Sequence, residues 1–178
     1  MKFKVFKFKK VKSTNNSAIR IIQNLNLDYG MIVSEIQSNG KGQYGKKWIS
    51  YKGNIFVSFF YKLESLSISL KQITKLNCLL VRKLLSNYYK KKIIYKKPND
   101  LLIDRKKICG ILQETLIKFD KKYIIVGIGI NLIKNPYIKN YPTTNLYELI
   151  GKKVSKNKIE NELKRIFELK LSKLYKKK

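Results

Sequence analysis

The sequence contains no histidine and only two cysteines among its 178 residues. Without histidine, a His-ligated zinc site and a histidine-based catalytic triad are both excluded. Cys78 and Cys109 lie far apart in the sequence and do not have the spacing of paired metal ligands. They therefore predict free thiols in a reducing compartment rather than a disulfide framework.

Long apolar runs are also missing. No apolar segment approaches the roughly 20 residues that a membrane-spanning helix needs. Residues 1–8 alternate lysine with apolar residues, so they lack the uninterrupted apolar centre of a signal peptide and instead predict a first β-strand. We therefore expect a cytoplasmic protein with no membrane partner.

Acidic residues are scarce: 11 stand against 40 lysines and arginines, and the net charge is +29. Such a charge often indicates a nucleic-acid partner. Only four of the basic residues are arginines, and the lysines are accompanied by many isoleucines, asparagines and tyrosines. These are residues of AT-rich codons, so compositional drift of a genome explains the charge at least as well as a phosphate-binding surface does. No DNA-recognition module is visible, so we expect no specific nucleic-acid partner.

The length fits one domain that can bury its core without disulfides or metals, and no repeat or linker divides it. Segments rich in β-branched and aromatic residues predict strands at residues 1–8, 31–36, 54–60, 93–95, 101–103, 107–112 and 123–130. Apolar residues at helical spacing predict helices that begin at one of the polar residues 13–16, span about 65–92 and span about 156–175. The terminal residues 176–178 are expected to form a solvated tail.

Glycine is sparse except at two places. Gly127 and Gly129 interrupt the strand at 123–130, which indicates that backbone or a ligand packs closely there. The other place is the loop from Gln37 to Trp48, where Gly40, Gly42 and Gly45 alternate with Lys41, Lys46 and Lys47. Glycines permit close backbone approach, so amide groups and lysines of this loop could converge on an anion.

Two familiar phosphate-binding patterns fit this loop only superficially. Gly40-x-Gly42-x-x-Gly45 resembles the dinucleotide fingerprint, and Gly40-x4-Gly45-Lys46 resembles the start of a P-loop. Both patterns must open a helix, whereas a predicted strand follows here. Lys47 also stands where a P-loop needs serine or threonine. A solvated lysine loop with no ligand remains the alternative for this segment taken alone.

Six motifs occur together, in the order seen in biotin–protein ligases, and this chain resembles that family over about residues 11–150. They are Ser13-Thr14-Asn15, the loop Gln37 to Trp48, Lys97-Pro98-Asn99-Asp100, Lys107-Ile108-Cys109-Gly110-Ile111-Leu112-x-Glu114, Val126-Gly127-Ile128-Gly129-Ile130-Asn131 and Thr143-Thr144-Asn145-Leu146. The resemblance implies an α+β fold, with a mixed, largely antiparallel sheet flanked by helices and related to class II aminoacyl-tRNA synthetases. It also implies a single catalytic domain over 1–178, without an N-terminal helix-turn-helix domain or a complete C-terminal β-barrel-like domain.

The implied reaction has two steps. The carboxylate of biotin attacks the α-phosphate of ATP, with Mg²⁺, to give biotinyl-5′-AMP and pyrophosphate. A lysine of a biotin carboxyl carrier protein or domain, as in acetyl-CoA carboxylase, then attacks the acyl carbon. No protein nucleophile and no metal-ligating residue is required of the chain.

The resemblance implies a role for each motif. Lys107 is the expected catalytic cation, and Asp100 is expected to receive the carrier lysine. The residues expected to contact biotin are Ser13, Thr14, Asn15, Gln37, Gly40, Lys41, Gly42, Gln43, Lys107 and Gly110. Those expected to contact ATP are Lys41, Trp48, Asn99 and Asn131. Structural readings stay open for three of these: an Asx turn for Asp100, ordinary core for Trp48, and a strand-edge charge for Lys107.

The chain departs from the family pattern at two motif positions. Gln43 stands where arginine is typical, and glutamine cannot offer a charged fork to a phosphate. Lys97 replaces a tryptophan.

A degenerate biotin-binding homologue with weak transfer is therefore one alternative function. Lipoate–protein ligase is another because it shares the fold and the adenylation step, although its basic and triple-glycine signature is absent here.

Overall fold

The computed structural model describes residues 1–63 and 68–175, and its main sheet has seven strands in the order β1-β2-β5-β9-β8-β7-β6. β1 is parallel to β2, and the other neighbouring pairs of this sheet are antiparallel. The expected α+β fold with a mixed, largely antiparallel sheet is confirmed. The strands are β1 Lys4–Val11, β2 Tyr29–Gln37, β5 Ile55–Lys62, β6 Ile94–Lys96, β7 Asp100–Ile103, β8 Lys106–Lys118 and β9 Lys121–Ile130, with a small separate hairpin of β3 Gly40–Lys41 and β4 Lys47–Trp48.

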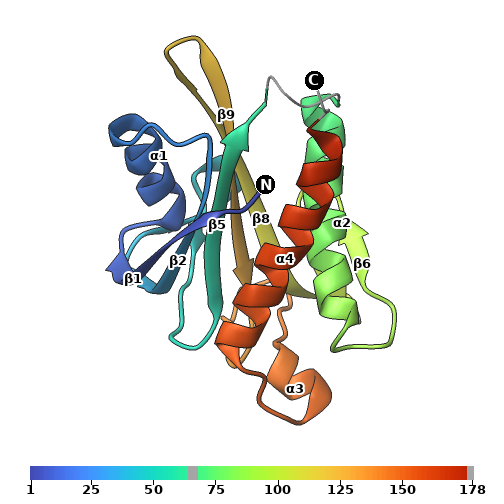
Figure 1. The fold of residues 1–178 in the computed structure, drawn as a ribbon. Coiled ribbons are helices and arrows are strands. Elements are labelled where there is room, and N and C mark those ends of the chain that lie inside the picture. Colours follow the sequence, from blue (N-terminus) through green and yellow to red (C-terminus); the bar gives the residue numbers. More distant parts are fainter. Residues whose placement is uncertain (64–67, 176–178) are drawn as a thin grey trace.

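Helices cover both faces of the sheet. α1 (Thr14–Asn24) lies on one face, while α2 (Leu70–Ser86) and α4 (Lys156–Leu174) lie together on the other (Figure 1). Alternate residues of each strand point to opposite faces. On β9, Tyr123 and Ile125 pack towards α1, whereas Ile124, Val126, Ile128 and Ile130 join the larger core under α2 and α4.

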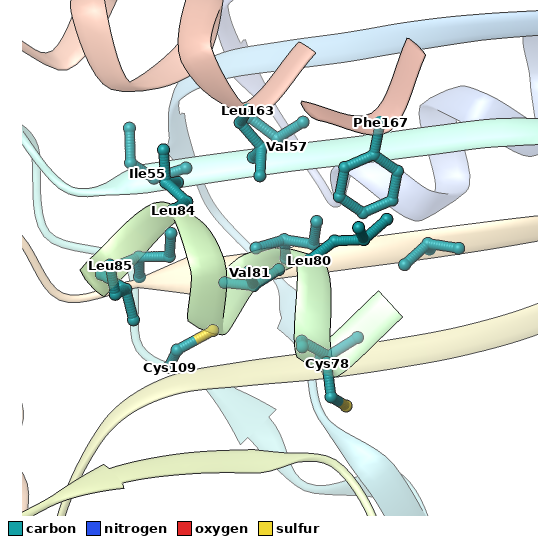
Figure 2. Packing of buried hydrophobic residues seen from close by; sticks show 14 of the residues in the cluster. Ile55, Val57, Cys78, Leu80, Val81, Leu84, Leu85, Cys109, Leu163 and Phe167 are labelled. Carbon is teal, nitrogen blue, oxygen red and sulfur yellow. The ribbon is translucent and has the colours of Figure 1, made fainter. Parts of the chain in front are cut away.

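The larger core holds the sheet to its two long helices. Leu80, Val81, Leu84 and Leu85 of α2 meet Leu163 and Phe167 of α4 above Ile55 and Val57 of β5 (Figure 2). The ring of Phe167 stacks on that of Phe59, with 4.2 Å between centroids and 7° between planes. This core lies on one face of the sheet, and the smaller core under α1 lies on the other.

Helix boundaries follow the capping residues more closely than the apolar repeat. α2 begins after Ser69, whose hydroxyl accepts from the backbone of Gln72 in a capping box. It ends at Ser86, before Asn87, so the expected span to residue 92 was too long. Part of the expected start, residues 64–67, lies outside the described residues, as does the expected tail at 176–178. The expected helix at 156–175 is confirmed as α4.

Several strand ends differ from expectation. β8 and β9 continue past their apolar segments because their antiparallel ladder extends to the turn at Phe119 and Asp120, both of which have positive φ. The strands expected at 93–95 and 101–103 are confirmed as β6 and β7, which pair as a hairpin, and Asp100 is the first residue of β7 and not part of the turn. The short helix α3, Leu146–Ile150, was not expected; the side chain of Asn145 caps it.

Both cysteines are free, as the sequence predicted, and both are buried. Burial raises the pKa of the Cys78 thiol to about 11 and raises the pKa of Cys109 as well. Both thiols are therefore protonated near neutral pH and belong to the core in Figure 2. None of the helices in the described parts of the chain is long and apolar enough to cross a membrane.

Candidate functional site

A cavity of about 570 Å³ opens next to the start of α1, on the part of the sheet face that this helix does not cover. Its walls come from the start of α1, the β3–β4 hairpin, the first half of β8, the last residues of β9, and the segment 136–143. It brings together residues that are up to 130 positions apart in sequence, from Ser13 to Thr143. Of the residues assigned from the sequence, those that line it are Ser13, Thr14, Asn15, Gln37, Lys41, Gly42, Gln43, Trp48, Asn99, Asp100, Lys107, Gly110 and Asn131.

Gly40 is the assigned residue that does not line the cavity. A Cβ atom at this position would lie 2.5 Å from the backbone oxygen of Trp48 and 2.9 Å from Nε2 of Gln37. Glycine is therefore needed where β2 and the hairpin approach each other. Among the three loop glycines, only Gly45 has a positive φ, of 73°. Gly40 therefore permits the close approach of two backbone segments, whereas Gly45 permits the left-handed backbone conformation.

The floor of the cavity consists of glycines that seat larger side chains. A Cβ atom on Gly129 would lie 2.4 Å from the indole of Trp48, and one on Gly110 would lie 2.7 Å from it. A Cβ atom on Gly127 would lie 2.3 Å from Oδ1 of Asn15. The close packing expected at Gly127 and Gly129 is confirmed, but the groups that fill the space are the side chains of Asn15 and Trp48, not the backbone or ligand that was expected.

One end of the cavity carries a hydrogen-bond network whose cavity-lining members, Thr14, Asn15 and Gln37, are uncharged. The backbone nitrogen and the hydroxyl of Thr14 donate to Oε1 of Gln37, at 2.8 and 3.1 Å. The buried hydroxyl of Ser58 lies 2.8 Å from Oγ1 of Thr14 and 2.6 Å from Oδ1 of Asn15. Nδ2 of Asn15 donates to Glu114 over 2.6 Å. The network fixes the orientation of each amide, and it suits a neutral ligand with both donors and acceptors.

The opposite end is cationic. Nζ of Lys107 lies 2.8 Å from Oδ1 of Asp100, and 5.4 Å from the centre of the Trp48 ring. The side chains of Lys107 and Asp100 are only 18% and 13% exposed. Lys107 is therefore a partly buried cation paired with a carboxylate inside the cavity, which separates it from the many solvated lysines of this chain.

Backbone hydrogen bonds fix the position of Lys107. Its nitrogen donates to the oxygen of Pro142 over 2.8 Å, and its oxygen accepts from the nitrogen of Thr144 over 3.0 Å. The segment 142–144 thereby adds to the β8 backbone next to the cavity. Lys107 is not at an open strand edge, so the alternative of an exposed edge charge is excluded.

Two asparagines connect the cavity wall to neighbouring backbone. Nδ2 of Asn99 donates to the oxygen of Ile111 over 2.8 Å, and Nδ2 of buried Asn131 donates to the oxygen of Thr144 over 3.0 Å. Oδ1 of Asn131 and Nε1 of Trp48 are buried and find no hydrogen-bond partner within the described ranges 1–63 and 68–175. Leaving a buried polar atom without a hydrogen bond costs free energy. Both atoms can therefore form a hydrogen bond to a ligand without breaking one within the protein.

Ser58 and Tyr141 are site residues that the sequence reading missed. Ser58 is a lone polar residue in the middle of the apolar segment 55–60, and this interruption was the signal that could have revealed it. Tyr141 donates a hydrogen bond of 2.6 Å to Oδ2 of Asp100. It lies in an irregular segment 41 positions away, and no local pattern marks it.

Comparisons with known proteins agree with this geometry. Residues 5–131 match the model of the biotin/lipoate A/B protein ligase family. The chain is similar to the bifunctional ligase/repressor BirA of Bacillus subtilis (27% identity over 154 residues, 82% of this chain) and of Escherichia coli (31% over 102 residues, 56% of this chain). It spans about half the length of the former, 47%, and 32% of the latter.

The fold is also similar to a solved structure, that of the biotin protein ligase from Aquifex aeolicus in complex with biotin and ATP. The TM-score is 0.80 and the sequence identity is 29%, over 96% of this chain and 71% of that one. The similarity thus extends over both helical layers and the whole sheet, beyond the residues that the family model matches.

Proposed function

The chain belongs to the biotin/lipoate A/B protein ligase family, and from this premise we propose that it is an ATP-dependent biotin–protein ligase. It forms biotinyl-5′-AMP and transfers biotin to a lysine of a carboxylase biotin carrier domain. The observation that carries this proposal is the polarity of the cavity, with the uncharged side chains of Thr14, Asn15 and Gln37 at one end and paired Lys107 at the other. The Aquifex aeolicus ligase, solved in complex with biotin and ATP, has the same fold.

The neutral end receives the ureido ring of biotin. Thr14, Asn15 and Gln37 offer hydroxyl and amide groups to the cavity, and the buried hydroxyl of Ser58 behind them helps to fix their orientations. A ureido ring that is buried there exchanges its bonds with water for bonds with the protein, so little free energy is lost. The valeryl chain then extends towards Lys107 past Gly110 and Gly42, which line the cavity and have no side chain to obstruct it.

In the first step, a carboxylate oxygen of biotin forms a bond to the α-phosphorus of ATP, and the bond from that phosphorus to pyrophosphate breaks. Two anions must approach each other for this reaction. The ammonium of Lys107 offsets their repulsion and stabilises the charge that develops on the phosphate oxygens. Lys41 adds a second cation, and Trp48 packs beside the adenylate.

In the second step, the amine of the carrier lysine forms a bond to the acyl carbon, and the bond from that carbon to the AMP oxygen breaks. The amine must lose a proton to act as a nucleophile. Asp100 is the one carboxylate among the described residues that line the cavity, so it is positioned to accept this proton.

Magnesium fits this site as an ion held mostly by the nucleotide. No group of three metal-ligating side chains occurs within the described part of the chain. Protein-bound Mg²⁺ commonly uses one or two protein oxygens together with substrate phosphates and water. The unpaired Oδ1 of Asn131 is the protein oxygen that would help to hold it. When bound, it neutralises charge on the phosphates.

The test is transfer itself. Purified protein with ATP, Mg²⁺ and a biotin carrier domain is expected to label one carrier lysine with biotin, detected by mass spectrometry. Lipoate offered to a lipoyl domain under the same conditions is expected to give no product, because its dithiolane ring has no ureido group to pair with Thr14 and Asn15. Lipoyl transfer faster than biotinyl transfer would reject the proposal.

Gln43 yields a separate prediction about the intermediate. It lines the cavity, yet a neutral hydrogen bond to phosphate is worth about 1 kcal/mol against about 1.5–3 kcal/mol for a charged one. We expect the natural protein to release free biotinyl-5′-AMP during turnover, and Gln43→Arg to reduce that release several-fold. Chromatography of reaction mixtures without a carrier measures it. Equal release by both proteins would show that Lys41 or Lys46 already holds the adenylate.

A further inference from the structure

The two oxygens of the Asp100 carboxylate have different partners. Oδ1 lies 2.8 Å from Nζ of Lys107, and Oδ2 accepts a hydrogen bond of 2.6 Å from the hydroxyl of Tyr141. The carboxylate is thus held from two sides, by a cation of β8 and by a phenol from the segment between β9 and α3. Neither oxygen is available to a carrier lysine in this arrangement.

Tyr141 is anchored beside Lys107 and is not a chance surface contact. Pro142, the next residue, accepts the backbone hydrogen bond of Lys107. The Tyr141 ring also lies 4.4 Å from Nζ of Lys96 and 5.6 Å from Nζ of Lys107, measured to its centre. Burial and the bond to Asp100 raise the pKa of Tyr141 well above its usual range, so the phenol keeps its proton and donates near neutral pH.

Substrate binding changes the two contacts of Asp100 unequally. Lys107 carries the charge that a biotin carboxylate and an α-phosphate attract, so these anions compete with Asp100 for its ammonium. The phenol of Tyr141 has no charge and no such competitor. When Lys107 turns to the substrates, Oδ1 of Asp100 is vacated while Oδ2 remains bound.

We propose that Tyr141 is the positioning residue of the transfer step: it holds Asp100 so that the oxygen vacated by Lys107 faces the carrier lysine. This inference rests on the proposed function. The incoming ammonium gives its proton to Oδ1, the free amine forms the bond to the acyl carbon, and AMP leaves as the bond from carbon to the phosphate oxygen breaks. Asp100 then returns the proton to solvent. The site thereby opens to the carrier only after the first step has recruited Lys107.

The experiment is to replace Tyr141 with phenylalanine, which keeps the ring against Lys96 and removes only the hydroxyl. Biotin-dependent pyrophosphate release reports the first step, and single-turnover transfer from preformed biotinyl-5′-AMP reports the second. Because a hydrogen bond to a carboxylate is lost, we expect the transfer rate at saturating carrier to fall about tenfold or more. Pyrophosphate release and the KM for the carrier are expected to change less than about twofold, since neither depends on Oδ2.

Two controls separate positioning from a structural effect. Tyr137 lies in the same segment, is 91% exposed and does not line the cavity, so Tyr137→Phe should leave both steps unchanged. If Tyr141 acts through Asp100, Tyr141→Phe should cost almost nothing further when it is added to Asp100→Asn, a non-additive result in a double-mutant cycle.

The outcomes distinguish the inference from the function on which it rests. An active natural protein whose Tyr141→Phe variant transfers at the normal rate would overturn the inference alone. Equal slowing of both steps, or full additivity with Asp100→Asn, would also overturn it, since Tyr141 would then support the site generally. A natural protein that transfers no biotin at all would overturn the proposed function, and the inference with it.

Discussion

Lys107→Ala is expected to lower the rate of biotin-dependent pyrophosphate release by on the order of 10²-fold or more. Its side chain is only 18% exposed, and its ammonium lies at the end of the cavity where the two anions of the first step would meet. In such a screened environment a fixed cation stabilises developing charge more strongly than a solvated lysine can. Exchange of labelled pyrophosphate into ATP, with and without biotin, measures the step directly.

The control for this variant is its neighbour. Lys106 is exposed and does not line the cavity, so Lys106→Ala changes the net charge equally and should retain normal pyrophosphate release.

Lys107→Ala also leaves the carboxylate of Asp100 unpaired, which costs stability. The double variant Lys107→Ala with Asp100→Asn removes that unpaired charge, and it should regain stability without regaining activity. Normal release by Lys107→Ala would remove the residue from the mechanism.

Phe167→Ala is expected to reduce the free energy of unfolding by about 3–5 kcal/mol. Phe167 is fully buried, and its ring stacks on Phe59 where α4 meets the sheet (Figure 2). Alanine removes both the buried area and the stacking contact and leaves a cavity. Because domains are typically stable by only about 5–15 kcal/mol, the thermal midpoint should fall by on the order of 10 °C. Circular dichroism during heating measures it.

Leu169 provides the matched control on the same helix, because its side chain is 57% exposed; Leu169→Ala should change the free energy of unfolding by less than about 0.5 kcal/mol. The candidate cavity lies on the other face of the sheet from α4. Phe167→Ala at low temperature, where it remains folded, is therefore expected to release pyrophosphate at the normal rate. A large loss of activity in the folded variant would show that the two faces are coupled.

The fold could be predicted from the sequence wherever a local pattern matched the final environment. Alternation and β-branched residues indicated the seven strands of the main sheet. The apolar repeat indicated α4 almost to the residue. Where a capping side chain or a long-range ladder set the boundary, the local pattern was insufficient. Ser69 and Asn87 delimit α2 inside its apolar repeat, and pairing with β9 carries β8 six residues beyond its apolar run.

For the site, the sequence determined which residue types would be present and in which motifs: the glycines that make room, the lysine that could meet a phosphate, and the polar residues that start α1. This information is local, because a motif is read along the chain. The tertiary structure decided which of these groups meet. Only the fold places Ser58 of β5 beneath Thr14 and Asn15, seats Trp48 on Gly110 and Gly129, and brings Tyr141 to Asp100. These contacts join residues 41 to 81 positions apart, and no short-range pattern of propensity or spacing encodes a contact between segments that only the folded sheet brings together.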